Sequence, residues 1–259
     1  VLWSAIVSLT HTDVVIVGGG VVGLTTALLL AAADLSLNIT LIDAKPPNPV
    51  WKQGGETPDW DIRTSAITRF TQNIWATLGV WPPIQEKRLA AYAKMAVYDA
   101  AGFGELHFDA AEIGEPDLGH IIENNVILTS LWTAVLENPA ITVKAPLALS
   151  RLEIEEDRVL IYHANDTKTG LKTDDSNISS LKPALTKPIS NLSSSGSNLS
   201  FPGSSGGSSK TRAKSLDCSV LLTKLLIGAD GPNSWVRNQL GIACDKTPYG
   251  QAAIITTVR

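Results

Sequence analysis

The sequence has 259 residues, which is enough for one large domain or two modest ones around a full hydrophobic core. Hydrophobic residues make up 44% of the chain and charged residues 18%, as in an ordinary globular protein. The formal net charge of −4 gives no electrostatic reason to expect nucleic acid or an anionic membrane surface as a partner. The two cysteines form no C-x-x-C motif and no ligand cluster with the four histidines. We therefore expect a reducing compartment and no metal site.

A short apolar segment followed by closely spaced glycines is the most informative feature near the start of the chain. Residues 14–17 are β-branched with no polar face, which suits a central parallel strand buried on both sides. Gly18 can take a tight turn, Gly20 lets the backbone approach a pyrophosphate, and Gly23 lets the next helix pack close to the strand. Residues 24–33 favour that helix, whose N-terminal amides and dipole would point at the phosphates.

The residues after this helix support dinucleotide binding. Residues 39–42 predict a second strand, and Asp43 ends it twenty positions after Gly23, where a carboxylate can accept hydrogen bonds from a ribose. One alternative is a glycine turn in any other α/β protein. Another is a membrane span, because residues 14–33 carry no charge, although the glycines and threonines within them argue against it.

Residues 44–60, rich in proline and glycine, predict a long loop that leads to Arg63. From this loop, a guanidinium could clamp the phosphates of a dinucleotide or meet a second charged cofactor; the alternative is a solvated surface arginine. A helical pattern then follows, with Gly79 in the position of a C-cap. Its apolar residues are Ile67, Phe70, Ile74 and Leu78.

The middle of the chain predicts alternating strands and helices. These are a hairpin within residues 92–109, a helix through residues 127–135, and strands at residues 141–143, 149–154 and 159–163, the last two paired. His107 and His120 could be general bases, but neither has an acidic partner at a telling spacing. Hydrogen-bonded structural histidines are the alternative.

Half of the twenty residues from Ser190 to Ser209 are serine and four are glycine, so we interpret residues 165–215 as a flexible insertion. The strand pattern resumes at residues 220–227, followed by a Gly-Ala-Asp-Gly turn and a helix over residues 234–240 that Gly241 would cap. Asp230 could there bind a polyol chain, or the segment could be a plain turn with a helix N-cap. Residues 252–258 begin another strand.

Several of these segments together resemble the class A flavoprotein aromatic hydroxylases, the group that includes para-hydroxybenzoate hydroxylase. Within that group, the chain is most similar to the ubiquinone-biosynthesis hydroxylases. The most specific matches are the Leu-Gly-His-Ile-Ile-Glu-Asn run at residues 118–124 and the Gly-Ala-Asp-Gly-x-Asn-Ser run at residues 228–234. The matching segments are residues 13–23, 61–67, 78–81, 108–109, 118–124, 228–237 and those from 249 onward.

The resemblance implies an α/β fold, the FAD-binding Rossmann-like fold of the para-hydroxybenzoate hydroxylase type, with part of a β-rich substrate domain. Residues 12–164 and 216–259 would form these parts, and residues 165–215 the insertion. By the same resemblance, several residues would contact cofactors. Gly18, Gly20, Gly23 and Asp43 would hold the ADP half of FAD, Arg63 would lie near the pyrophosphate and the passing nicotinamide cofactor, Asn124 would contact the flavin, and Asp230 with Gly231 would bind the ribityl chain.

The activity that the resemblance implies is hydroxylation of a polyprenylated phenol or quinol in ubiquinone biosynthesis, most like that of the 2-octaprenylphenol hydroxylases. NAD(P)H reduces the flavin, and O2 adds to it as a C4a-hydroperoxide that attacks the ring. The protein supplies orientation and a water-excluding pocket, so no catalytic side chain is assigned. A long isoprenoid substrate implies a cytoplasmic enzyme that works peripherally at the inner membrane or with other ubiquinone-biosynthesis proteins.

The chain also departs from this family. Members continue well beyond residue 259, so we expect the sequence to be the N-terminal portion of such an enzyme, one that binds FAD weakly alone. Two alternatives remain open. One is another oxidoreductase with the same cradle, either a different FAD enzyme or an NAD-dependent dehydrogenase. The other is a catalytically incompetent fragment that serves as a binding or assembly module.

Overall fold

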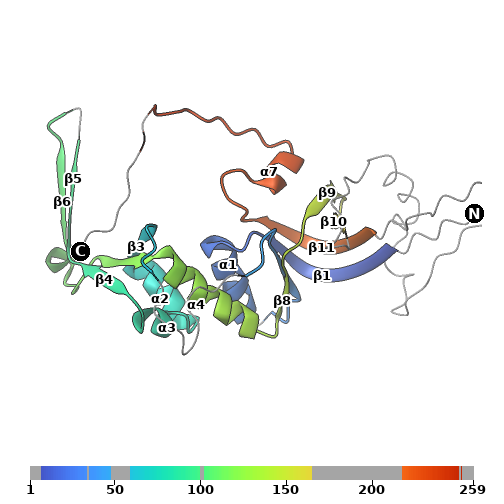
Figure 1. The fold of residues 1–259 in the computed structure, drawn as a ribbon, viewed down its shortest axis with the longest axis horizontal. Helices are drawn as coiled ribbons and strands as arrows, with labels where there is room; N and C mark the ends of the chain where they lie inside the picture. Colours follow the sequence, from blue (N-terminus) through green and yellow to red (C-terminus); the bar gives the residue numbers. More distant parts are fainter. Residues whose placement is uncertain are drawn as a thin grey trace, which may run out of the picture. The chain divides into compact units, whose positions relative to one another are not determined.

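A computed structural model describes residues 7–33, 35–47, 59–99, 102–164, 218–250 and 252 (Figure 1). The chain divides into two compact units, a smaller one of Val1–His11 and Leu147–Lys224 and a larger one of Thr12–Pro146 and Leu225–Arg259. Strands β1 (Val7–Val17) and β11 (Cys218–Gly228) each contribute residues to both units. The division by residue range made from the sequence stays a prediction.

The larger unit contains a sheet with the order β8-β2-β1-β11. Strand β2 (Ile39–Ile42) runs parallel to both β1 and β8 (Ile141–Lys144). Residues 14–17 of β1 are all buried, as predicted for a central parallel strand, and so are all four residues of β2. Helices α1 (Val21–Ala32) and α4 (Asn124–Glu137) pack against each other and share one hydrophobic core with this sheet. The strands and helices expected in these positions are confirmed.

A second sheet of the larger unit has the order β3-β7-β4. Strand β7 (Gly119–Glu123) is antiparallel to both β3 (Thr64–Thr68) and β4 (Leu89–Tyr92). Two helices pack on each other beside it, α2 (Arg69–Thr77) and α3 (Trp81–Gln85). In the register of β3 and β7, Thr64 is paired with Glu123 and Thr68 with Gly119, so the start of β3 lies beside the start of α4.

The helix predicted from Ile67, Phe70, Ile74 and Leu78 is confirmed as α2, but its predicted start at Ile67 is wrong. Ile67 belongs to strand β3, and Phe70 is 75% exposed. The helix begins only at Arg69, because the hydroxyl of Thr68 accepts a hydrogen bond from the amide of Thr71 and so caps α2. The residue of α2 that is buried in the core is Trp75, which is 1% exposed, rather than Phe70. The C-cap prediction is confirmed, since Gly79 has a φ of 72°.

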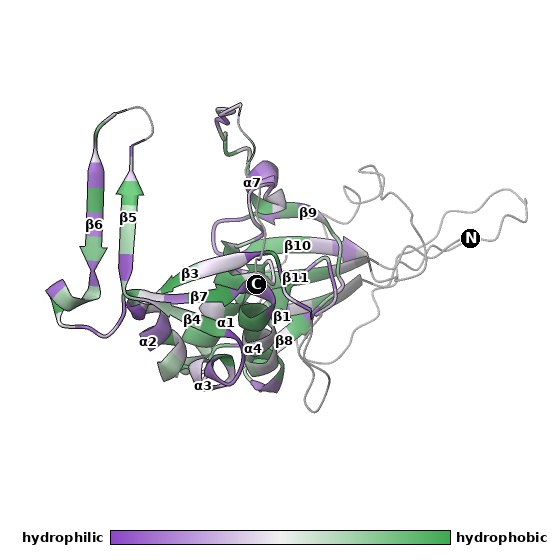
Figure 2. Cartoon of the chain, turned by 60° about the vertical axis from the view of Figure 1, so that its left-hand side comes forward, coloured by the Kyte–Doolittle hydropathy of each residue, from purple (hydrophilic) through white to green (hydrophobic). Residues whose placement is uncertain are grey.

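Strands β5 (Lys94–Tyr98) and β6 (Glu105–Asp109) form a two-stranded sheet within the described residues and confirm the predicted hairpin. The ammonium of Lys94 lies 2.9 Å from the carboxylate of Asp109 and, with the amide of Ala111, holds the pKa of Asp109 below its usual value. Figure 2 shows hydrophobic residues along both strands. Met95, Val97 and Phe108 are among the exposed apolar side chains of this hairpin. A short 3₁₀ helix, η1 (Ala110–Ile113), follows it.

The smaller unit contains an antiparallel sheet of β9 (Leu149–Ile154), β10 (Val159–Ala164) and the first part of β11. The predicted pairing of β9 with β10 is confirmed, and the amide of Glu155 donates to the carbonyl of Arg158 at 2.8 Å in the turn between them. Its core contains Leu160, Tyr162, Val220 and Leu222. The predicted insertion at residues 165–215 lies outside the described residues, and so does the strand expected over residues 252–258, except for residue 252.

No helix among the described residues is long and apolar enough to cross a membrane. Helix α1, which follows the first glycines, has 12 residues. The uncharged run that raised the possibility of a span is therefore divided between a strand of the sheet and a short buried helix.

Candidate functional site

The glycine turn between β1 and α1 is packed so tightly that two of its positions exclude any side chain. Gly18 has a φ of +116°, and its amide donates to the carbonyl of Ile42 at 2.8 Å. A Cβ on Gly18 would lie 2.3 Å from the carbonyl oxygen of Ala229, and a Cβ on Gly23 would lie 1.9 Å from that of Gly18. Both distances are shorter than any real contact, so both positions require glycine.

The start of helix α1 is open. Gly20 is its N-cap residue, no side chain caps the helix, and its first turn has no acidic residue. A Cβ on Gly20 would meet nothing within 4 Å. The first amides of a helix have no partner within the helix and carry its positive dipole end, so this uncapped N-terminus can receive an anion. This geometry fits the phosphate role predicted for Gly18, Gly20 and Gly23.

Asp43 lies against the same turn. One carboxylate oxygen accepts a hydrogen bond from the amide of Gly19 at 2.6 Å, and the other accepts one from the amide of Lys45 at 2.7 Å. The structure thus brings Asp43 to the glycine turn, and its contact with a ribose stays a prediction. Sequence reasoning missed Gly19, where a Cβ would lie 2.3 Å from the ring of Trp132 on α4. The third adjacent glycine was the available signal.

The second glycine turn, between β11 and α7 (Trp235–Gln239), lies directly beside the first. The amide of Ala229 donates to the carbonyl of Val17 at 2.7 Å. One carboxylate oxygen of Asp230 accepts from the amides of Trp235 at 2.6 Å and Val236 at 3.2 Å. The hydroxyl of Ser234 accepts from the amide of Arg237 at 3.0 Å, so α7 is capped by the protein's own side chains.

Asp230 nevertheless keeps one acceptor unused. Its second carboxylate oxygen, Oδ1, is buried and has no hydrogen-bond partner among the described residues. A buried carboxylate oxygen without a donor is costly, so this atom fits a hydroxyl donor supplied by a ligand. Gly231 follows with a φ of +85°, which accounts for a glycine in the turn. The N-cap alternative therefore describes one oxygen of Asp230, and the ligand role remains available to the other.

Arg63 and Asn124 come together where β3 begins and α4 begins. The amide of Asn124 donates to the carbonyl of Arg63 at 2.9 Å, and the hydroxyl of Ser65 donates to the side-chain oxygen of Asn124 at 2.7 Å. The guanidinium of Arg63 is exposed and makes no hydrogen bond or ion pair with any described residue. The backbone at Arg63 is thus fixed while its charged group stays available for an anion.

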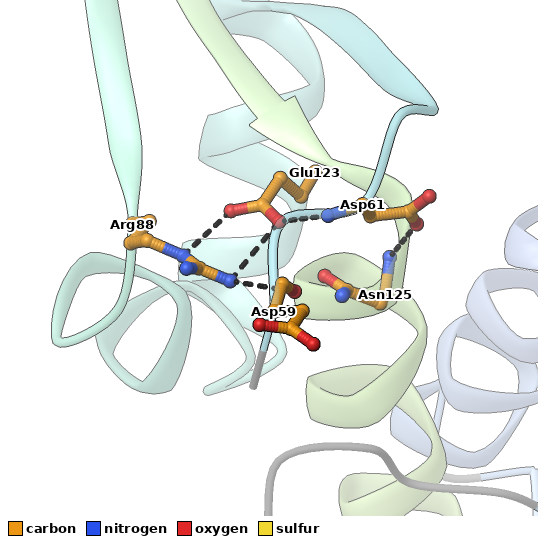
Figure 3. A network of polar contacts seen from close by, with 5 residues as sticks. All are labelled: Asp59, Asp61, Arg88, Glu123 and Asn125. Atoms are coloured by element: carbon orange, nitrogen blue, oxygen red, sulfur yellow. Dashed lines mark hydrogen bonds and ion pairs between the residues drawn. The ribbon is translucent and has the colours of Figure 1, made fainter. Parts of the chain in front are cut away.

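A partly buried polar network surrounds this point (Figure 3). The carboxylate of Glu123, which is 3% exposed, pairs with the guanidinium of Arg88 at 2.7 Å and accepts from the amide of Asp61 at 2.7 Å. Asp61 in turn accepts from the amide of Asn125 at 3.1 Å. Sequence reasoning assigned no role to these side chains. The available signal was a glutamate in the apolar run that ends β7.

The two histidines singled out from the sequence do not join this site. His107 lies on the exposed hairpin and contacts the carboxylate of Glu105. His120 lies on β7, where its ring meets that of Trp81 edge-on at 5.2 Å and its Nδ1 is buried without a hydrogen-bond partner among the described residues. Among the residues that the structure describes, no group of three or more His, Cys, Asp or Glu is placed to hold a metal ion.

Comparison with known proteins agrees with this geometry. A family model described as FAD dependent oxidoreductase matches residues 13–56, which include the first glycine turn and Asp43. The chain is 29% identical over 248 residues to the 3-demethoxyubiquinol 3-hydroxylase of Escherichia coli (strain K12), an alignment that covers 96% of this chain and 48% of that protein. It is 29% identical over 259 residues to the human mitochondrial ubiquinone biosynthesis monooxygenase COQ6, covering 99% of this chain and 45% of the human protein.

Solved structures share the fold. The flavin-dependent monooxygenase PieE, in complex with FAD and substrate, superposes with a TM-score of 0.55 at 19% identity and covers 92% of this chain and 33% of its own. The p-nitrophenol 4-monooxygenase PnpA of Pseudomonas putida DLL-E4 gives a TM-score of 0.55 at 17% identity, covering 92% of this chain and 45% of its own. The predicted FAD-binding Rossmann-like fold class is confirmed.

The resemblance predicted from the sequence is confirmed as well, because the chain matches ubiquinone-biosynthesis hydroxylases along nearly its whole length. The chain spans about half the length of the curated relatives it matches. The finer likeness to 2-octaprenylphenol hydroxylases stays a prediction. In sequence this chain is similar to hydroxylases of ubiquinone biosynthesis, and in fold it is similar to flavin-dependent monooxygenases.

Proposed function

We propose that the chain forms the FAD-binding part of a monooxygenase that hydroxylates a polyprenylated phenol or quinol ring in ubiquinone biosynthesis, with NAD(P)H and O2 as co-substrates. The observation that carries the proposal is the first glycine turn. It has two positions where only glycine fits, an uncapped helix N-terminus and a carboxylate held against it. Such a turn binds the pyrophosphate of a dinucleotide.

The described residues fit FAD in several places. The amides at the start of α1 would hold the pyrophosphate beside Gly18, Gly20 and Gly23. Asp43, which ends β2, would accept from the ribose of the adenosine. In the second turn, the unpartnered oxygen of Asp230 would accept a hydroxyl of the ribityl chain, with Gly231 beside it.

Arg63 and Asn124 lie together at the start of α4 and would complete the site. The exposed guanidinium of Arg63 would stabilise the charge of the cofactor phosphates, or that of a nicotinamide cofactor as it reduces the flavin. The side-chain oxygen of Asn124 is already engaged by Ser65, so its amide nitrogen would donate to the flavin. These roles rest on position and chemical type.

Bound FAD would supply the redox chemistry, the transfer of one oxygen atom of O2 to an aromatic ring with electrons from NAD(P)H. The chain's own contribution is to bind the cofactor, to orient it and to exclude water. The site residues therefore need not form an acid–base pair, and we assign no catalytic residue.

The substrate class follows from the relatives. The Escherichia coli relative is named as a hydroxylase of demethoxyubiquinol, the human relative as a ubiquinone biosynthesis monooxygenase, and a Rhodospirillum rubrum relative, 26% identical over 95% of this chain, as ubiquinone hydroxylase UbiL. We propose the same class of ring here. A polyprenylated substrate favours peripheral association with a membrane and contact with other ubiquinone-biosynthesis proteins, and we propose a cytoplasmic location at the inner membrane.

The experiment that tests the proposal is an absorbance spectrum of the purified chain after incubation with FAD and removal of free cofactor. Because we expect the chain alone to bind FAD weakly, the expected result is resolved flavin bands at less than full occupancy, followed by NAD(P)H oxidation that increases when a short-chain prenylphenol is added. Hydroxylated product, identified by mass spectrometry, would establish the reaction. A colourless protein would contradict FAD binding by this chain and favour the alternative of a non-catalytic binding or assembly module.

A second candidate is a different FAD oxidoreductase. The family model supports it, because its description names an FAD dependent oxidoreductase without specifying monooxygenation. The two candidates differ in their use of oxygen. A monooxygenase consumes NAD(P)H and O2 in step with the phenol it hydroxylates, whereas an oxidase reduces O2 to hydrogen peroxide while it oxidises its substrate directly, without NAD(P)H. Measuring oxygen uptake with and without NAD(P)H separates them.

A further inference from the structure

We propose that Glu123 and Arg88 are positioning residues of the cofactor site. Their partly buried ion pair fixes residues 61–63 against the start of α4, and so determines where Arg63 and Asn124 are presented to the cofactor. The proposal rests on the proposed function, because Arg63 and Asn124 are site residues only if the chain binds FAD. The residues involved belong to the larger unit of the chain.

The ion pair of Glu123 and Arg88 has two short contacts. Nη2 of Arg88 donates a hydrogen bond to Oε2 of Glu123 at 3.1 Å, and Nε lies 2.7 Å from Oε1, where the two atoms form an ion pair without hydrogen-bond geometry. Nη2 also donates to the carbonyl of Asp59 at 3.2 Å, and the guanidinium lies 4.2 Å from the centre of the Trp60 ring. Arg88 therefore joins the end of β7 to the segment that precedes Arg63.

Glu123 reaches that segment directly as well. Its Oε2 accepts a hydrogen bond from the amide of Asp61 at 2.7 Å, although the two residues are 62 positions apart (Figure 3). With 3% of its surface exposed, the charge of Glu123 must be balanced by protein groups rather than by water. The Asp61 amide and the Arg88 guanidinium are those groups, so residue 61 is fixed to the end of β7.

Asp61 connects residues 61–63 to the start of α4 through hydrogen bonds. Its Oδ1 accepts from the amide of Arg63 at 2.9 Å, and its Oδ2 accepts from the amide of Asn125 at 3.1 Å. Because the N-cap residue of α4, Glu123, gives no side-chain cap of its own, Asp61 caps the helix from 64 positions away. Both oxygens of Asp61 are used within the protein, so its role in the Asp-Ile-Arg run is structural.

Arg63 is left with a fixed backbone and an available charge. Its amide is held by Asp61 and its carbonyl by the amide of Asn124, whereas its guanidinium has no described partner. A residue whose backbone is fixed and whose charged group has no partner within the protein is suited to bind a ligand. The two arginines thus have different roles: Arg88 fixes residues 61–63, and Arg63 would contact the cofactor.

The first test needs no cofactor. Glu123→Gln keeps the shape of the side chain and removes the charge, and hydrogen exchange is measured at the amides of Arg63 and Asn125. We expect exchange at least about tenfold faster at these amides than in the wild type, because local opening governs exchange. Unchanged exchange at both amides would overturn the proposal.

The matched control is Asp117→Asn. Asp117 pairs with Arg69 at 3.1 Å near the other end of the same two strands, where Thr68 is paired with Gly119. This variant also breaks a partly buried ion pair, but it is expected to leave exchange at Arg63 and Asn125 within about twofold of the wild type. An equal effect of both variants would show general loosening of the sheet and would overturn a specific role for Glu123.

The second test measures coupling with Arg63 through the dissociation constant of FAD, by flavin fluorescence. We expect Arg63→Ala to weaken binding about tenfold, as for loss of one charged contact, and Glu123→Gln about fivefold. If Glu123 acts through Arg63, its substitution has less than about a twofold effect in the Arg63→Ala background. Independent, multiplying fold-changes would overturn the positioning role.

The outcomes separate this inference from the proposed function. A wild-type chain that binds no FAD contradicts FAD binding by this chain and the role of Arg63 in it, while hydrogen exchange still decides whether Glu123 fixes residues 61–63. FAD binding that Glu123→Gln leaves unchanged overturns the inference and leaves the proposed function intact. If Glu123→Gln fails to fold, Arg88→Lys keeps the charge and loses the planar guanidinium, and it is taken through the same measurements.

Discussion

The two glycine turns of the larger unit are neighbours with the same order of elements, a strand, a glycine turn and a helix, yet they treat the helix N-terminus in opposite ways. At the first turn, α1 begins at Gly20 with no side-chain cap. At the second, α7 is capped by Asp230 and Ser234. An uncapped N-terminus attracts an anion, whereas a capped one has already satisfied its amides.

The comparison shows why the two turns would bind different parts of one ligand. The first offers backbone donors and suits phosphate oxygens, while the second offers one unpartnered acceptor, Oδ1 of Asp230, and suits a hydroxyl. The turns are in direct backbone contact, since Gly18 packs on the carbonyl of Ala229. A ligand with a pyrophosphate and a polyol could therefore use both at once, as FAD would.

The largest effect is expected from Gly23→Ala. Its Cβ would lie 1.9 Å from the carbonyl oxygen of Gly18, so the backbone of the first turn must move. We expect the free energy of unfolding to fall by about 3 kcal/mol or more, measured by urea unfolding followed by circular dichroism. The matched control is Gly20→Ala, where a Cβ meets nothing within 4 Å and the loss should be at most about 1 kcal/mol. Equal losses would contradict the tight packing of the first turn.

Gly20→Asp would convert the first turn into a capped one like the second. Aspartate is a preferred N-cap residue, and its negative charge interacts favourably with the helix dipole. The free energy of unfolding should therefore stay equal or rise by roughly 0.3 kcal/mol. FAD binding should weaken about a hundredfold, or about 2.8 kcal/mol, which is the repulsion of two like charges about 6 Å apart at a dielectric constant of about 20. Thermal unfolding and a flavin titration would show the two opposite changes. Unchanged affinity would mean that the phosphates lie elsewhere.

Asp230→Asn tests the second turn while keeping the shape of the side chain. A neutral amide is a weaker acceptor than a carboxylate, so we expect FAD to bind about tenfold more weakly, or about 1.4 kcal/mol. The cap on α7 should weaken by at most about 1 kcal/mol, because an asparagine oxygen still accepts from the amides of Trp235 and Val236. A flavin titration checks the first number and urea unfolding the second. Unchanged affinity would exclude a ligand at Oδ1.

The features that could be predicted from the sequence are those fixed by local chemistry. The bounds of β2 and β9 follow from short apolar or alternating runs between turn residues, and both are confirmed. Each glycine turn follows from the conformations that glycine alone permits, and Gly18 and Gly231 indeed have positive φ. The first strand, glycine turn and helix, with the second strand and Asp43, indicated dinucleotide binding, whereas the FAD-binding Rossmann-like fold was predicted from the family resemblance.

What could not be predicted depends on contacts between distant residues. The predicted start of α2 was too early because Thr68, which caps the helix, is also the last residue of β3. Thr68 is paired with Gly119 of β7, about 50 positions further along the chain, and helical spacing carries no information on that pairing. The polar network around Glu123 could not be predicted for the same reason. Glu123 was visible as a charge in an apolar run, but its partner Arg88 is 35 positions away and the amide of Asp61 is 62 positions away. Only the packing of the sheet brings them together.

The smallest effect separates capping from ligand binding at the second turn. Ser234, 8% exposed, accepts one hydrogen bond from the amide of Arg237, and unlike Asp230 it keeps no buried oxygen without a partner. Ser234→Ala should therefore lower the free energy of unfolding by about 1 kcal/mol in urea and leave FAD affinity within about twofold of the wild type. Loss of affinity equal to that of Asp230→Asn would mean that the second turn contributes to binding through the position of α7 as a whole. Retained affinity would assign the ligand contact to Asp230 itself, since both variants weaken the same cap and only one changes the unpartnered oxygen.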